Sequence, residues 1–192
     1  MRLFVAIDVG DAVRAEAGRV IRTISEQIDA VKTPPKLTWV KPAALHVTVR
    51  WIGEVDQTAA DDLCERLRPP IEMAPFDVEW RGVGAFPSVR HPRALWLGVV
   101  RGAGPLGQLE AEVSRRIAGT VDSERKPLLP HLTLGRVKMA GAGMDWPKVL
   151  QQVDVRNART QVERVTLYQS RLSQQGPHYT GLVSAPLIAK NE

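Results

Sequence analysis

The sequence is poor in the residues that support several common classes of site. It has a single cysteine, Cys64, among 192 residues, so no disulfide can form within the chain. Cys64 follows Leu63 in a stretch with helical spacing of apolar residues, which favours a small core residue over a nucleophile. A reducing cytoplasm is therefore the compartment we expect.

Long hydrophobic runs are also lacking. The apolar run at Leu3–Ile7 ends at Asp8, too early for a signal peptide, and no other run approaches the length of a membrane-spanning helix. The sequence contains no Gly-x-Ser-x-Gly nucleophile elbow and no phosphate-binding P-loop. These absences argue against a membrane protein, a serine hydrolase of that type and a P-loop NTPase.

Charge is unbalanced but dispersed. The formal net charge is +5 and the pI is about 9.7, yet no block of Lys or Arg forms a basic tail. A basic balance favours an anionic ligand such as a nucleic acid, although an ordinary basic surface explains it equally well.

Periodicity predicts a mixture of helices and strands. Helices are expected at 12–31, with Asp11 as its cap, at 58–67, with Asp56 as its cap, from Gly104-Pro105 to near Gly119, and at 146–153. Strands are expected at 3–7, 37–40, 45–52, 76–83, 95–100, 131–137, 162–170 and 179–187, with a loop at 84–93 and turns at 141–143 and 173–177. The irregular order predicts an α+β fold with antiparallel sheets, spanning 1–192 as one domain or two closely packed lobes.

One pattern occurs twice in a strand-like frame. In Leu45-His46-Val47-Thr48-Val49-Arg50-Trp51-Ile52, alternation places His46 and Thr48 on one face and Val47, Val49 and Trp51 on the other. Pro130-His131-Leu132-Thr133-Leu134-Gly135 repeats this, with His131 and Thr133 opposite Leu132 and Leu134. A third His-x-Thr, at 178–180, lacks the apolar frame. Because the two framed histidines are 85 residues apart, nearly half the chain, we expect two lobes with one histidine each.

Two facing imidazoles suit displacement at phosphorus. A neutral one can deprotonate the attacking water or hydroxyl, and a protonated one can protonate the departing oxygen. Thr48 and Thr133, two residues beyond their histidines, can donate hydrogen bonds to non-bridging phosphate oxygens. Two nitrogen ligands without a nearby cysteine or carboxylate cluster are too few for an ordinary zinc site, so we expect no metal and no other cofactor.

The chain resembles the two-histidine (2H) phosphoesterase superfamily, specifically the RNA 2',3'-cyclic phosphodiesterases known as 2'-5' RNA ligases. Besides the two framed motifs, the segments Phe4-Val5-Ala6-Ile7-Asp8, Trp39-Val40, Phe86-Pro87, Arg93-Ala94-Leu95-Trp96-Leu97-Gly98-Val99, Leu167–Leu172 and Gly176–Tyr179 match the family pattern. The resemblance implies two pseudo-symmetric α+β lobes, each an antiparallel sheet with packed helices, around a central cleft. It also implies opening of a terminal 2',3'-cyclic phosphate of RNA to a 2'-phosphomonoester without metal, with His46 and His131 as the catalytic pair and Thr48 and Thr133 as phosphate ligands.

The chain departs from the family at two places. Leu129 stands where relatives often have Arg or Lys, and Arg50 stands where they usually have a small or apolar residue. Strict alternation places Arg50 on the His46 face and Arg136 on the opposite one, so Arg50 is the first candidate for the missing cation.

Other residues are weaker candidates for substrate contacts. Arg136 is a candidate for contacting phosphate, although strict alternation turns it toward the other face. Trp39 and Phe86 are candidates to stack a terminal base or to pack in the core, and Tyr179 to lie near the cleft or to pack its strand. His91 and Arg93 fit electrostatic guidance of RNA or a solvated loop, and His178 is expected outside the pair. The expected partner is an RNA with a 2',3'-cyclic phosphate end, bound by a monomer.

Two alternatives stay open. The same chemistry run backwards, with a 5'-hydroxyl replacing water, is reversible 2'-5' RNA ligation. A non-catalytic RNA-binding module would use the histidines only to hold phosphate. The symmetry of the motifs also leaves open which histidine is the acid and which the base.

Overall fold

A computed structural model describes residues 1–121, 128–173 and 176–189 of the chain. Its strands and helices are β1 (Arg2–Asp8), α1 (Asp11–Asp29), β2 (Lys36–Trp39), the 3-10 helix η1 (Pro42–Ala44), β3 (His46–Glu54), α2 (Gln57–Leu67), β4 (Ile71–Glu72), β5 (Phe76–Pro87), β6 (Pro92–Arg101), α3 (Ala103–Ile117), β7 (His131–Met139), α4 (Trp146–Gln152), β8 (Ala158–Val162), β9 (Arg164–Ser173) and β10 (Gly176–Ile188).

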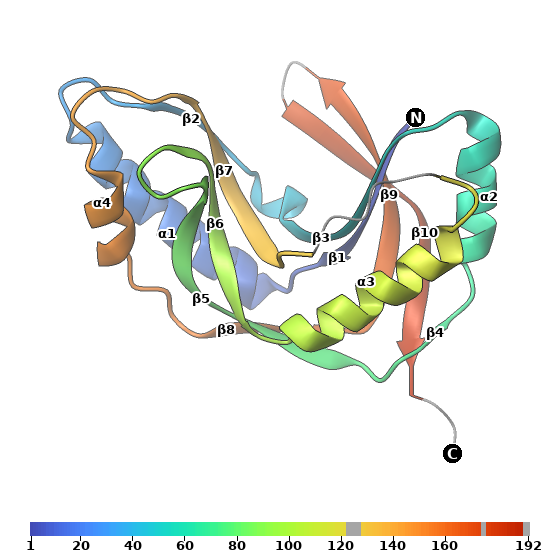
Figure 1. The fold of residues 1–192 in the computed structure, drawn as a ribbon. Coiled ribbons are helices and arrows are strands. Elements are labelled where there is room, and N and C mark those ends of the chain that lie inside the picture. Colours follow the sequence, from blue (N-terminus) through green and yellow to red (C-terminus); the bar gives the residue numbers. More distant parts are fainter. Residues whose placement is uncertain (122–127, 174–175, 190–192) are drawn as a thin grey trace.

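The strands form two five-stranded sheets, one in each lobe. The first sheet has the order β3-β1-β9-β10-β4, and the second has the order β2-β7-β6-β5-β8. All pairings are antiparallel except that of β4 with β10. Figure 1 shows the two sheets diverging from a shared base, where β3 and β7 are in contact. The predicted α+β fold with two antiparallel lobes is confirmed.

The lobes are joined by an exchange of helices. Helix α1 leaves the first sheet through β1 but packs against β8 of the second, together with α4 (Figure 1). Helix α3 leaves the second sheet through β6 but packs against β3 of the first, together with α2. Each of these helices therefore covers the sheet of the other lobe.

Apolar stripes explain why these helices form and where they pack. In α1 the residues Val13, Ala17, Val20, Ile24 and Ile28 recur at helical spacing and are all buried. Burying an aliphatic side chain stabilises the fold by about 1.5–3 kcal/mol, so this stripe fixes α1 to the second sheet. The predicted helix positions are confirmed.

The cap predictions had different outcomes. Asp56 caps α2, since its Oδ1 accepts a hydrogen bond from the Ala59 N–H at 2.8 Å. The prediction that Asp11 caps α1 is wrong. Gly10 is the N-cap, and Asp11 is the first helical residue, where it pairs with Arg14 at 3.2 Å.

The second sheet is larger than predicted. The segment 84–93, expected to be a loop, is mostly the β5–β6 hairpin, in which Phe86 pairs with Ala94. Strand β8 was not predicted, and it pairs with β5 from Phe76 to Trp80. The expected turn at 141–143 is tied to the segment after α1, because Ala142 N–H donates to the Thr33 carbonyl at 3.1 Å. The turn expected at 173–177 lies partly outside the described residues.

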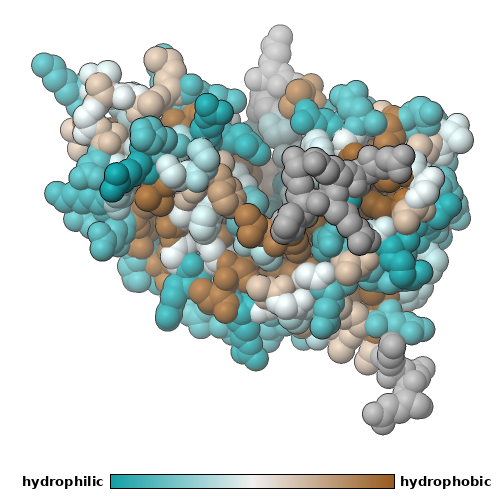
Figure 2. All heavy atoms as spheres, in the orientation of Figure 1, coloured by the Kyte–Doolittle hydropathy of each residue, from teal (hydrophilic) through white to brown (hydrophobic). Residues whose placement is uncertain are grey.

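The surface matches this packing. Figure 2 shows hydrophilic residues over the outer parts of both lobes and most of the hydrophobic ones toward the middle of this face. Within the residues that the structure describes, no helix has the length and apolar character needed to cross a membrane.

Candidate active site

The two framed histidines open the two strands that meet at the base of the lobes. His46 is the first residue of β3 and His131 the first of β7. The Nδ1 of His46 lies 2.8 Å from the Ala44 carbonyl oxygen, and the Nδ1 of His131 lies 2.7 Å from the Leu129 carbonyl oxygen. Each carbonyl accepts from a protonated Nδ1, which leaves Nε2 of each ring to accept or donate a proton.

Each histidine strand has a β-bulge directly after its threonine. In β3, Ala6 pairs with Thr48 and Val5 with Arg50, so Val49 is the extra residue. In β7, Trp96 pairs with Thr133 and Leu95 with Gly135, so Leu134 is the extra residue. A bulge of one residue reverses the alternation beyond it. The matching bulges make the two motifs structural equivalents.

The bulge in β3 overturns the predicted orientation of Arg50. Arg50 is 7% exposed and turns away from the His46 face toward α3, where its Nη1 lies 3.2 Å from Glu110 Oε1. The next residue, Trp51, takes the opposite orientation to the one predicted and is 48% exposed. Arg50 is thus a buried link between β3 and α3 rather than a cation of the histidine face.

The bulge in β7 has the opposite consequence for Arg136. Strict alternation predicts that Arg136 lies with Leu132 and Leu134, but both Leu134 and Gly135 face the core and Arg136 is exposed. Arg136 therefore lies on the face of His131 and Thr133. Its charge also reaches the first lobe, where it acts on the Tyr179 hydroxyl. Of the two candidates for the cation missing at Leu129, the structure brings Arg136 to the site.

Aromatic rings surround His46. Phe4 lies 4.9 Å from His46 and Tyr179 lies 5.1 Å from it, between ring centroids. Phe4 is also stacked on Trp51 and on Tyr168. The guanidinium of Arg2 lies 4.8 Å from the centroid of the Trp51 ring, a cation–π contact. The sequence analysis missed Arg2, Phe4 and Trp51 as site residues, although Arg2 and Phe4 share their strand face with Asp8.

A smaller group of rings surrounds His131. Phe86 meets His131 edge-on at 4.9 Å, and Trp96 lies 5.2 Å from Phe86 and 6.3 Å from His131. The Trp96 ring lies over Gly84, where a Cβ would be only 2.2 Å from it. The close approach therefore requires glycine at position 84. Each imidazole is thus positioned by aromatic contacts from its own sheet.

The surroundings of His46 shift the pKa of its ring, and the sequence alone does not reveal this shift. Burial lowers the pKa of His46, and the nearby His131 lowers it further, whereas the Ala44 carbonyl and the Asp8 carboxylate raise it. Asp8 pairs with His46 across β1 and β3, and Asp8 Oδ1 accepts a hydrogen bond from the Tyr168 hydroxyl at 2.7 Å. Burial and this bond raise the pKa of Tyr168 to about 12, so Tyr168 stays a donor to Asp8.

The remaining predicted residues lie as follows. Thr48 and Thr133 are partly buried, one pleat repeat from their histidines. Trp39 packs against the hydrophobic core and covers Gly135, so its predicted alternative as a core residue is the one the structure favours. Leu129 is exposed, and its carbonyl holds His131. His178 is exposed on β10.

Comparison with known proteins identifies the family of the chain. The sequence pattern described as the 2'-5' RNA ligase superfamily matches residues 20–174. The chain belongs to the 2'-5' RNA ligase superfamily. It is 37% identical over 167 residues to the RNA 2',3'-cyclic phosphodiesterase of Aeropyrum pernix, covering 86% of this chain and 93% of that protein. It is 33% identical over 186 residues to the protein of the same name from Archaeoglobus fulgidus, covering 95% and 98%.

Solved structures of superfamily members share the fold. The crystal structure of TT0787 of Thermus thermophilus matches with a TM-score of 0.69 and 26% identity, covering 100% of both chains. That of Escherichia coli LigT complexed with NADP+ matches with a TM-score of 0.66 and 25% identity, covering 97% of this chain and 96% of that one. Within the described parts of this superfamily member, no group of three or more His, Cys, Asp or Glu is placed to hold a metal ion.

Proposed function

We propose that this protein hydrolyses the terminal 2',3'-cyclic phosphate of RNA to a 2'-phosphomonoester, using His46 and His131 as a general acid–base pair. The observation that carries the proposal is that both imidazole rings make the same hydrogen bond through Nδ1. Each Nδ1 is bonded to the carbonyl two residues before it, at 2.8 and 2.7 Å, so each Nε2 is left for chemistry. The curated relatives named RNA 2',3'-cyclic phosphodiesterase support the same substrate.

The reaction needs one proton on the pair. The neutral imidazole takes a proton from water while the water oxygen forms a bond to phosphorus. The bond from phosphorus to the 3'-oxygen breaks, and the protonated imidazole gives its proton to that oxygen. The lowered pKa of His46, which results from burial and to which the charge of His131 contributes, supports this state, because two neighbouring positive rings are unfavourable. The protons balance whether His46 is the base and His131 the acid, or the reverse.

Hydroxyl and guanidinium groups supply the phosphate contacts in this proposal. Thr48 and Thr133 donate to the non-bridging oxygens, where fixed donors stabilise the charge of the transition state. Arg136 supplies the positive charge that many relatives have at the position of Leu129. It is supported by its place on the His131 face and by its effect on Tyr179 in the other lobe.

The exposed rings on the histidine faces suit the terminal nucleoside. Trp51 is 48% exposed beside Phe4, and Arg2 lies over its ring. Base stacking on aromatic side chains is a common way to hold single-stranded RNA ends. We assign Trp51, together with Tyr179 or Phe86, to contact with the last base.

A hydrolysis assay tests the proposal. Wild-type protein incubated in EDTA with an oligonucleotide ending in 2',3'-cyclic phosphate should yield the 2'-phosphomonoester. His46→Ala and His131→Ala should each lower kcat by about 10²- to 10⁴-fold, since each removes one proton transfer. His178→Ala is the matched control, because His178 is also followed by x-Thr but lies outside the pair.

The outcomes separate the alternatives. Full activity in either catalytic variant, with folding verified by circular dichroism, would refute the paired role. RNA binding without any product would favour a non-catalytic module. Joining of a 5'-hydroxyl strand to the cyclic end would identify ligation, and loss of activity in EDTA would contradict a metal-independent mechanism.

A further inference from the structure

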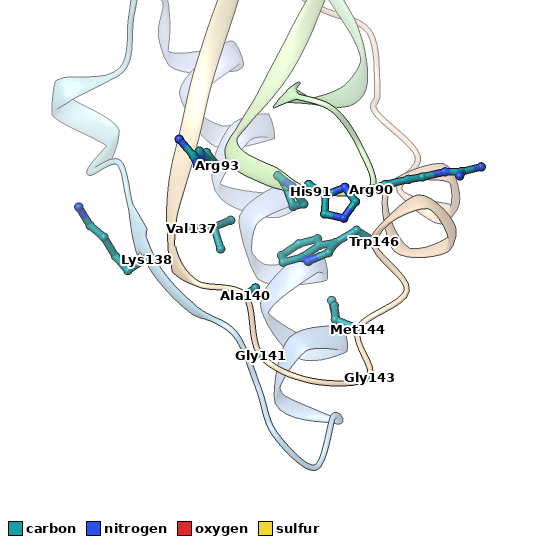
Figure 3. Close-up of a pocket in the computed structure, with 11 residues that line it drawn as sticks. Arg90, His91, Arg93, Val137, Lys138, Ala140, Gly141, Gly143, Met144 and Trp146 are labelled. Carbon is teal, nitrogen blue, oxygen red and sulfur yellow. The ribbon is translucent and has the colours of Figure 1, made fainter.

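A pocket of about 370 Å³ lies at the far end of β7, outside the histidine site. It is formed where β7 ends, beside the β5–β6 turn and the start of α4. Its floor is apolar and includes Pro92, Val137, Met144 and Trp146. Its rim carries Arg90, Arg93, Lys138 and His91. Figure 3 shows Trp146 and Val137 near the middle, with Arg90 on one side and Arg93 and Lys138 on the other. We call this the outer pocket.

The walls of the outer pocket are held by hydrogen bonds and burial. Trp146 is 3% exposed and begins α4, whose N-cap Asp145 accepts from the Lys148 N–H at 3.2 Å. On the opposite wall, the His91 N–H donates to Ser88 Oγ at 3.2 Å within the hairpin turn. The pocket is therefore a preformed feature of the second lobe.

The charged residues that line the outer pocket are all positive. Arg90, Arg93 and Lys138 are exposed, and among the described residues they form no ion pair. None of the described residues that line the pocket is acidic. Elsewhere on the surface arginines commonly pair with a neighbouring carboxylate, as Arg68 does with Glu65 at 3.0 Å. Unpaired cations around an apolar floor match a ligand with both an anionic and an apolar part, as a nucleotide has.

Strand β7 connects this pocket to the histidine site. Beyond its bulge, Arg136 and Lys138 are both exposed on β7, two residues apart. From His131 to Lys138 the strand covers roughly 20 Å. The positive charges therefore continue from the place where a cyclic phosphate would react to the rim of the outer pocket.

We infer that the outer pocket binds an upstream nucleotide of the same RNA strand whose 3' end lies between His46 and His131. Arg90 on one side, and Arg93 and Lys138 on the other, contact the phosphates that flank this nucleotide, and the floor around Met144 and Val137 contacts its base or ribose. This inference rests on the proposed function. Substrate binding should then depend on RNA length, because a dinucleotide reaches the histidines but not the outer pocket.

The test compares substrates of two lengths in the Arg90→Ala/Arg93→Ala double variant. For an RNA of roughly 10 nucleotides with a cyclic phosphate end, KM should rise roughly tenfold with kcat unchanged. The slope of log K against log salt concentration should become shallower by roughly one to two, which corresponds to the loss of one to two phosphate contacts. For a dinucleotide 2',3'-cyclic phosphate, kcat and KM should stay as in the wild type. The matched control is Arg68→Ala/Arg115→Ala, which removes two exposed arginines, one at the C-cap of α2 and one in α3, on the other lobe.

A second readout keeps this inference separate from the proposed function. Fluorescence anisotropy with the same long RNA ending in a 3'-hydroxyl measures binding without catalysis, and the double variant should lose roughly tenfold in affinity. Equal effects on both substrate lengths, or no effect in either assay, would contradict the inference that the outer pocket binds an upstream nucleotide. Absence of hydrolysis of both the long RNA and the dinucleotide by the wild type would instead overturn the proposed function, whatever the anisotropy shows.

Discussion

At the residue scale, the tautomer and charge of His46 depend on burial and on the polar groups near its ring. Burial has the largest effect on the pKa of the ring and lowers it, while the Ala44 carbonyl, which holds Nδ1, and the Asp8 carboxylate raise it. The Tyr168 hydroxyl in turn donates to Asp8 at 2.7 Å. Asp8 is therefore a carboxylate that favours the protonated form of His46.

Asp8→Asn should lower the pKa of His46 further. Removing the carboxylate leaves burial and the charge of His131 less opposed, so the pKa of the ring should fall below that in the wild type. NMR titration of the imidazole signals measures it, and the acid limb of the kcat profile should move in the same direction. Asp11→Asn, at a fully exposed carboxylate on α1, is the control. An unchanged His46 titration in Asp8→Asn would contradict this role.

At the element scale, the β5–β6 hairpin controls the position of His131. Trp96 on β6 lies flat over Gly84 on β5, and this brings its ring to Phe86 and His131. The packing depends on the missing side chain, since a Cβ at position 84 would lie 2.2 Å from Cη2 of Trp96. The hairpin thus positions the His131 ring through aromatic contacts, as the aromatic residues around Phe4 position the His46 ring.

Gly84→Ala should displace Trp96 and loosen the contacts of His131. We expect a loss of about 1–3 kcal/mol in the free energy of unfolding from overpacking, together with a lower kcat. Urea denaturation and the hydrolysis assay measure the two effects. Gly107→Ala is the matched control, because Gly107 lies in the interior of α3 with no atom within 4 Å of the added Cβ. That substitution should stabilise the protein by about 0.5–1 kcal/mol.

At the scale of the whole molecule, carboxylates with lowered pKa values hold helices in place. Hydrogen bonds from Arg115 and Arg116 lower the pKa of Glu112 to about 2, although burial opposes them. Arg116 in turn donates to the carbonyls of Pro69 and Pro70, which joins α3 to the end of α2. On the other lobe, burial raises the pKa of Glu16, but hydrogen bonds from Arg19 and from the Arg156 N–H outweigh it and leave that pKa lowered.

The stability of the protein should therefore fall in acid. The unfolded chain binds a proton at Glu112 near pH 4.5 and the folded chain only near pH 2, so this contribution is complete above 4.5 and is lost as the pH falls toward 2. Urea denaturation at pH 7, 5 and 3 measures the slope. Glu112→Gln should be less stable than the wild type at pH 7 and should show a weaker pH dependence between 4.5 and 2. Parallel curves for the two proteins would contradict the assignment.

The sequence by itself determined the two framed histidine motifs, the helix stripes and the family resemblance, because these depend on residue type and local spacing. Only the tertiary structure decided which neighbours face the histidines. A bulge in each histidine strand is set by its partner strand, and the extra residue reverses the alternation that a single strand predicts. That reversal buries Arg50, exposes Trp51 and brings Arg136 to the site.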